Sequence, residues 1–81
     1  MTVRILLFAI LRDAAGVPGL SVDLPDAATA QFAAASLVDR FPLIQPYLHR
    51  IAYAINQQYA PALTALHDGD ELALIPPVSG G

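Results

Sequence analysis

The chain has 81 residues, which suits one small domain and is too short for two. Its net charge is −3 and its four arginines are scattered, so no basic stripe is present to bind nucleic acid. Cysteine is absent, which excludes disulfide bonds, a thiolate nucleophile and a thiolate metal site.

The first apolar segment, 2–11, is short and β-branched at its start, which predicts a strand. It lacks the flanks of a signal sequence and is too short to cross a bilayer, so we expect a cytoplasmic protein with no membrane contact. Both faces of the strand are largely apolar, so both need cover. Alternation sorts the side chains into two sets, Val3, Ile5 and Leu7 on one face and Arg4, Leu6, Phe8 and Ile10 on the other.

The next two segments predict a short helical turn and a second strand. Residues 11–16 form the turn, which Gly16 ends. Residues 20–24 alternate and stop at Pro25, so we expect a strand that pairs antiparallel with the first.

Residues 26–42 predict the main helix. Asp26 or Thr29 can cap its start, and Pro42 stops it. Phe32 falls on the side away from the apolar stripe, and nothing in the sequence accounts for it. The stripe itself has helical spacing and consists of Ala30, Ala33, Ala34, Leu37, Val38 and Phe41.

An irregular connection and two strands are predicted to follow the helix. The connection covers residues 43–49. Residues 50–56 alternate as a strand, and residues 57–63 form a short edge strand that Pro61 limits.

The final strand follows a tight turn. The turn covers residues 67–70 and uses Gly69. The strand covers residues 71–75, and its side chains alternate, Leu72 and Leu74 inward and Glu71, Ala73 and Ile75 outward.

The order of elements is strand, strand, helix, strand, short strand and strand, which predicts an α+β fold with a mixed sheet. We expect the first and last strands to lie side by side at its centre. The one main helix covers one face of the sheet only. The other face therefore needs a partner protein, and its expected contacts are Leu6, Phe8, Tyr59 and Ile75.

No self-contained active site is visible in the sequence. His49 and His67 are isolated, so we expect no metal site. Asp68 and Asp70 flank Gly69 without the other ligands of a calcium loop, so an ordinary turn is expected. A catalytic pattern of histidine and acid is also missing around the three serines, Ser21, Ser36 and Ser79.

The closing segment, 76–81, offers chemistry of a different kind. Pro76 and Pro77 hold the exit extended, and Gly80 and Gly81 have no side chains to clash in a narrow slot. Six residues reach at most ~20 Å, which places a terminal carboxylate inside another protein. An ionised carboxylate must be activated, most simply as an acyl-adenylate. A frayed end is the alternative; we expect a functional tail whose active sites belong to other proteins.

Three stretches resemble one family: ILLFAILRDAAG at 5–16, AINQQYA at 54–60 and LHDGDELALIPPVSGG at 66–81. The chain resembles the MoaD family, the ubiquitin-like sulfur carriers that form the small subunit of molybdopterin synthase. The spacing from DGDE to PPVSGG is more specific than a terminal Gly-Gly alone. The resemblance implies a ubiquitin-like β-grasp fold over 1–81, with 76–81 as a flexible functional tail.

The resemblance also implies a cycle of sulfur transfer. An E1-like adenylyltransferase (MoeB-like) uses ATP to adenylate Gly81, and a sulfur donor converts the adenylate to a thiocarboxylate. The tail then enters the large subunit of molybdopterin synthase (MoaE-like), which carries the catalytic side chains. There two thiocarboxylates in turn supply the dithiolene sulfurs to precursor Z, within an expected heterotetramer. No cofactor is expected to stay bound to this chain.

The expected site residues fall into two groups, and none of them is a metal ligand. Gly81 carries the reacting group, and the segment inserted with it consists of Pro76, Pro77, Val78, Ser79 and Gly80. The expected partner-binding residues are Phe8, Leu6, Tyr59, Ile75 and Arg12.

Three other functions fit the same residues. One is a carrier on the same fold that serves thiamine or cysteine biosynthesis. Another is a ubiquitin-like modifier joined to target lysines; because this chain has no lysine, it cannot build chains on its own lysines. The third is a plain binding module with an inert tail.

Overall fold

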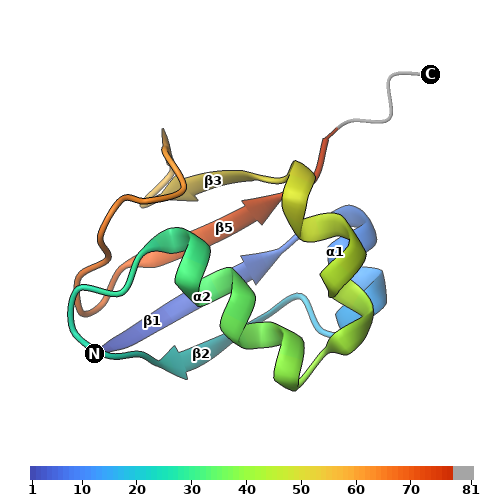
Figure 1. Cartoon of the computed structure of the whole chain (residues 1–81), viewed down its shortest axis with the longest axis horizontal. Coiled ribbons are helices and arrows are strands. Elements are labelled where there is room, and N and C mark those ends of the chain that lie inside the picture. The colour runs from blue at the N-terminus through green and yellow to red at the C-terminus, as the bar shows by residue number, and fades with distance from the viewer. Residues whose placement is uncertain (78–81) are drawn as a thin grey trace.

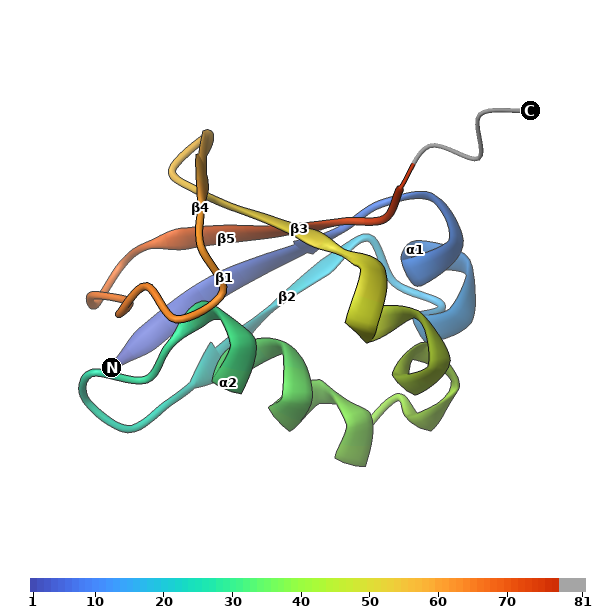
Figure 2. The same cartoon turned by 45° about the horizontal axis from the view of Figure 1, so that its top comes forward.

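The computed structural model describes residues 1–77. Their strands are β1 (Thr2–Leu7), β2 (Gly19–Asp23), β3 (Ala52–Ile55), β4 (Gln58–Ala60) and β5 (Glu71–Ile75). Their helices are α1 (Ala9–Ala15), α2 (Ala30–Ser36) and the 3-10 helices η1 (Leu37–Asp39) and η2 (Pro42–Arg50). Within these residues the strands form one sheet in the order β2-β1-β5-β3-β4 (Figure 1). The helices gather on one side of it (Figure 2).

The centre of the sheet is the pair of β1 and β5, which run parallel. Ile5 lies opposite Leu72 in this pair. The other neighbours, β1 with β2, β3 with β5 and β3 with β4, are antiparallel, so the sheet is mixed. The predicted α+β architecture and its central pair are therefore confirmed.

The faces of β1 are as predicted, but the strand is shorter. Val3, Ile5 and Leu7 are buried among the core side chains, and Phe8 is exposed on the other side. Ile10 was predicted to belong to the strand, and this was wrong because it lies in α1. The chain turns at Ala9, the first residue of α1, whose φ is +50°.

Helix α1 ends as the sequence indicates. Gly16 has a φ of +80°, which favours glycine, and its N–H donates to the carbonyl of Arg12 at 2.8 Å. The helix begins two residues earlier than the predicted turn, and its one buried residue is Leu11.

Helix α2 buries the first three residues of the predicted stripe, Ala30, Ala33 and Ala34, in the core. Thr29 caps it, because its Oγ1 accepts the N–H of Phe32 at 3.1 Å, whereas Asp26 does not. The α-helix ends at Ser36, earlier than predicted, and a 3-10 turn follows. The Ser36 hydroxyl donates to the carbonyl of Ala33 at 2.7 Å, a local bond that competes with the helical pattern.

The segment predicted as an irregular connection is instead helix η2, so that expectation was wrong. Pro42 suits the first position of a helix because its fixed φ matches and its missing N–H is not needed. Pro46 lies inside the segment, where its ring would clash with the carbonyl four residues earlier in an α-helix, which disfavours the α form. Ile44 anchors η2 in the core.

The last loop is a tight turn, as predicted. Gly69 has a φ of +85°, and the carboxylate of Asp68 accepts the N–H of Thr2 at 2.7 Å. The carboxylate of Asp70 accepts the N–H of His67 at 2.7 Å and the side-chain amide of Asn56 at 3.0 Å. These bonds give both carboxylates structural roles. No helix among residues 1–77 is long and apolar enough to cross a membrane.

Candidate functional site

The uncovered side of the sheet carries a shallow hollow of about 320 Å³. Phe8 is 44% exposed and Tyr59 is 77% exposed, which is unusual for such large side chains. We call its eight lining residues the open-face patch: Leu6, Phe8, Ala54, Gln57, Tyr59, Glu71, Ala73 and Ile75. Four of the five predicted partner-binding residues thus come together on one surface.

The hollow arises from the register of four strands. Leu6 on β1 lies opposite Ala73 on β5, Ala73 lies opposite Ala54 on β3, and Ala54 lies opposite Tyr59 on β4. The two alanines in the middle of this row are small, and the residues at its ends are large. A depression therefore forms between Leu6 and Tyr59, open to solvent.

Arg12, the fifth predicted contact, lies elsewhere. It belongs to α1, which follows β1 and sits on the helix side of the sheet. It does not line the open-face patch. Its predicted role in binding a partner is not supported by proximity to the other four residues.

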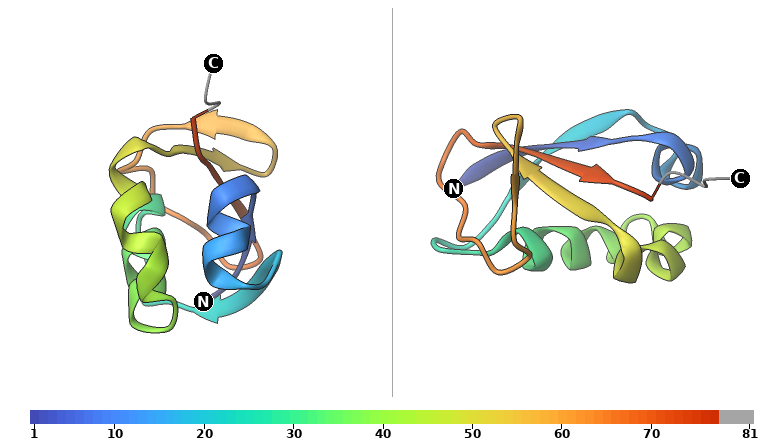
Figure 3. Two further views of the ribbon diagram at one scale, coloured as in Figure 1. Left: turned by 90° about the vertical axis from the view of Figure 1, so that its right-hand side faces the viewer. Right: turned by 90° about the horizontal axis from the view of Figure 1, so that it is seen from above.

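The tail leaves the sheet from the end of its central strand. Pro76 follows β5 and is buried, and Pro77 is exposed. Both line a hollow of about 340 Å³, the tail-root hollow, with Ile10 from α1 and with Tyr47 and Arg50 from η2. Figure 3 shows β5 ending beside these two helices, at the end of the sheet away from the N-terminus.

The predicted tail continues beyond Pro77. Val78, Ser79, Gly80 and Gly81 lie outside the described residues. The tail begins between the two hollows, because Ile75 lines the open-face patch and Pro76 lines the tail-root hollow.

The tail-root hollow was not predicted from the sequence, because the helix η2 that forms one of its walls was not predicted. The spacing of Ile44 and Leu48, four residues apart after Pro42, was the available signal for a helical segment. Pro46 between them obscured it. A predicted helix over this segment would have suggested Tyr47 and Arg50 as possible neighbours of the last strand.

Two ionisable side chains in the described residues have shifted pKa values, and neither lies in the open-face patch. The backbone N–H of His67, with the Asn56 amide, lowers the pKa of Asp70. Burial raises the pKa of Tyr53. Among residues 1–77, no group of three or more histidine and acidic side chains is close enough to hold a metal ion. The arrangement suits docking and presentation of a tail.

A mixed sheet packed on one main helix, with the first and last strands parallel at its centre, defines the ubiquitin-like β-grasp class. The sequence model of the ThiS family matches residues 5–81, and the chain belongs to this family. The fold and the family expected from the sequence are both confirmed.

Relatives in this family are similar over nearly their whole length. A molybdopterin synthase sulfur carrier subunit from Arabidopsis thaliana is 37% identical over 79 residues, which cover 98% of this chain and 82% of the relative. The crystal structure of SAMP1 from Haloferax volcanii has a TM-score of 0.89 and 34% identity, with 100% of both chains covered. A chain in the complex of subunits 1 and 2 of the molybdopterin-converting factor from Helicobacter pylori has a TM-score of 0.71 and 26% identity, again over 100% of both chains.

Proposed function

We infer that this protein is the sulfur carrier subunit of a molybdopterin synthase and acts in the cytoplasm. One observation supports the inference: the central strand β5 ends at Ile75 in an exposed apolar patch, and the sequence continues from there as Pro-Pro-Val-Ser-Gly-Gly. Relatives that are 34% to 39% identical over the whole chain have this function by name. A docking face next to a narrow tail is what a carrier needs to present its end to an enzyme.

The chemistry belongs to Gly81. In this proposal its carboxylate attacks the α-phosphorus of ATP on an E1-like adenylyltransferase, which forms an acyl-adenylate and releases pyrophosphate. A sulfur donor then replaces AMP and leaves a thiocarboxylate. Transfer of that sulfur and hydrolysis return the carboxylate. Glycine suits the position because it has no side chain beside the reacting carbonyl.

The partner at the transfer step is the large subunit. The solved complex from Helicobacter pylori pairs subunit 1 with subunit 2 of a molybdopterin-converting factor, and this chain resembles one of its chains. We assign the open-face patch to that contact and the segment 76–81 to insertion. Six residues reach at most about 20 Å beyond the sheet. Two carriers, each bearing a thiocarboxylate, would in turn supply the two dithiolene sulfurs to precursor Z, within a heterotetramer.

The test is reconstitution with ATP, an E1-like adenylyltransferase, a sulfur donor and a large subunit. We expect the intact mass of the carrier to rise by the exchange of one oxygen for sulfur, and precursor Z to be consumed. Deletion of Gly81 should abolish both while the protein stays folded. Leu63→Ala is the control, because Leu63 is exposed in the loop between β4 and β5 and lines neither the open-face patch nor the tail-root hollow. Sulfur transfer by the deletion variant would refute the proposal.

A ubiquitin-like modifier is a second candidate, and one observation favours it. SAMP1 from Haloferax volcanii, whose second crystal structure is described as a small archaeal modifier protein, is similar to this chain with TM-scores of 0.89 and 0.83. Expression of tagged protein in its source cells separates the two functions. Isopeptide-linked products that disappear when Gly81 is deleted would support the modifier; a thiocarboxylate without such products would support the carrier.

A further inference from the structure

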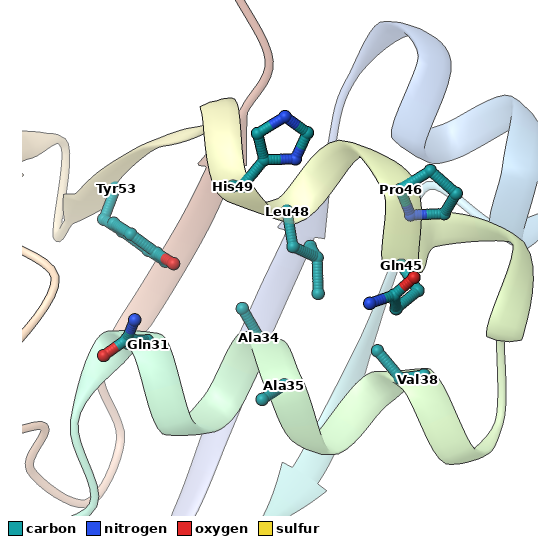
Figure 4. Close-up of a pocket in the computed structure, with 9 residues that line it drawn as sticks. All are labelled: Gln31, Ala34, Ala35, Val38, Gln45, Pro46, Leu48, His49 and Tyr53. Carbon is teal, nitrogen blue, oxygen red and sulfur yellow. The ribbon is translucent and has the colours of Figure 1, made fainter.

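The turn between β3 and β4 lies in the AINQQYA stretch at 54–60. Strand β3 separates two surfaces: Tyr53 points toward the groove between α2 and η2 (Figure 4), and Ala54, the next residue, lines the open-face patch. Asn56 and Gln57 form the turn itself. The patch continues along this hairpin, because Gln57 and Tyr59 line it as well.

Both turn residues have a left-handed backbone. The φ angle is +51° at Asn56 and +70° at Gln57, and a two-residue turn of this kind usually has glycine at its second position. Asparagine adopts such a conformation readily, but glutamine is uncommon there. Strand β4 is an edge strand of only three residues, so few bonds join it to β3. The turn therefore needs support from outside the hairpin.

Asn56 provides this support by bonding to the start of β5. The paired residues of β3 and β5 end at Ile55 and Leu72. Beyond them, the N–H of Asn56 donates to the carbonyl of Glu71 at 2.8 Å, and the side-chain carbonyl of Asn56 accepts the N–H of Glu71 at 3.0 Å. The side-chain amide donates to the carboxylate of Asp70 at 3.0 Å. One asparagine side chain thus joins the turn to the central strand.

Asp70 is a well-fixed acceptor for that amide. Its other carboxylate oxygen accepts the N–H of His67 at 2.7 Å, and its backbone carbonyl accepts the N–H of Arg4 on β1 at 3.0 Å. The bonds from His67 and from Asn56 lower the pKa of Asp70, so its carboxylate is ionised at neutral pH. Hydrogen bonds to an ionised acceptor are stronger than neutral ones, which favours a single position of the turn.

We propose that Asn56 is a positioning residue for docking, an inference that rests on the proposed contact with the large subunit. Asn56 does not line the open-face patch, whereas Gln57, Tyr59 and Glu71 do. Its two side-chain bonds fix the turn relative to β5, so that Tyr59 already lies opposite Ala54 at the rim of the patch before a partner arrives. Without these bonds the partner must order the turn as it binds, and that cost lowers the affinity.

An exchange of the two bonded side chains tests this role. In Asn56→Asp two carboxylates face each other at neutral pH, and the Kd for the large subunit should rise about 5-fold. Adding Asp70→Asn reverses donor and acceptor and keeps the net charge of the parent, so the Kd should return to within about 2-fold of the parent value. His67→Ala is the control and should bind like the parent, because its backbone N–H still reaches Asp70 and its side chain does not line the patch.

A Tyr59→Ala background separates positioning from a general loss of stability. Asn56 acts through Tyr59 in this proposal, so Asn56→Asp should raise the Kd by less than about 2-fold once Tyr59 is replaced. An equal rise in both backgrounds would overturn the proposal. Parent-like binding by Asn56→Asp, or no recovery in the exchanged pair, would overturn it as well.

The free protein offers a readout that needs no partner. The ¹H–¹⁵N heteronuclear NOE values of the Gln57 and Tyr59 amides should fall in Asn56→Asp and return in the exchanged pair, because they report fast motion of the backbone. Unchanged values in Asn56→Asp would overturn the positioning role. A parent protein that shows the expected NOE pattern but does not bind the large subunit would instead refute the proposed function.

Discussion

Tyr59→Ala should weaken binding of the large subunit about 30-fold. The side chain is 77% exposed on edge strand β4, so of the roughly 200 Å² that a tyrosine can bury, about 150 Å² is open to a partner. A partner that covers half of that area gains about 2 kcal/mol at about 25 cal/mol per Å², which corresponds to about 30-fold in Kd. Little of the side chain packs within the monomer, so the melting temperature should hardly change.

Isothermal titration of purified large subunit into each variant measures this effect. Leu63→Ala is the control, because Leu63 is 73% exposed but does not line the open-face patch. An unchanged Kd for Tyr59→Ala would show that the open-face patch is not the contact. An equal loss for both variants would show that the effect comes from general surface hydrophobicity instead of this patch.

Three further changes test the same structure. Ala73→Leu fills the middle of the open-face patch, so size-exclusion chromatography should show no complex with the large subunit while circular dichroism shows a folded monomer. Asp70→Asn should make stability less dependent on pH in acid. Folding lowers the pKa of Asp70, so its ionised carboxylate stabilises the protein fully above the unfolded value of 3.8. This contribution is lost as pH falls through the lower folded value. Melting temperatures measured from pH 5 downward check this, and equal slopes would contradict it. Thr29→Ala removes the cap of α2 and should lower the free energy of unfolding by about 1 kcal/mol in urea, and a loss near zero would mean that the hydrogen bond to Phe32 contributes nothing.

Some of the fold could be predicted because it depends on local rules. Alternation along β1 fixes which side chains share a face, so the exposure of Phe8 and the burial of Ile5 followed from the sequence. A threonine before an alanine-rich run favours a helix start, and Thr29 caps α2. Where an apolar run has no clear period, strand and helix look alike, and Ile10 was placed in the wrong element.

The site was predictable only as a set of residues. The open-face patch follows from the outward side chains of the strands, but its hollow depends on Ala73 lying between Leu6 and Ala54, a register set by tertiary pairing. The tail-root hollow depends on η2, whose two prolines hid the helical spacing. Neither packing arrangement can be predicted from a local sequence pattern.

The central pair of strands also governs when the protein can fold. Ile5 pairs with Leu72, which lies 67 positions further along the chain, so the middle of the sheet closes only after a long loop. During synthesis β1 therefore lacks its central neighbour until nearly all of the chain has been made. A truncated product that stops before Glu71 cannot complete the sheet and stays exposed to proteolysis. We therefore expect folding to fail in chains that lack β5, whereas a chain shortened only within residues 78–81 keeps all five strands.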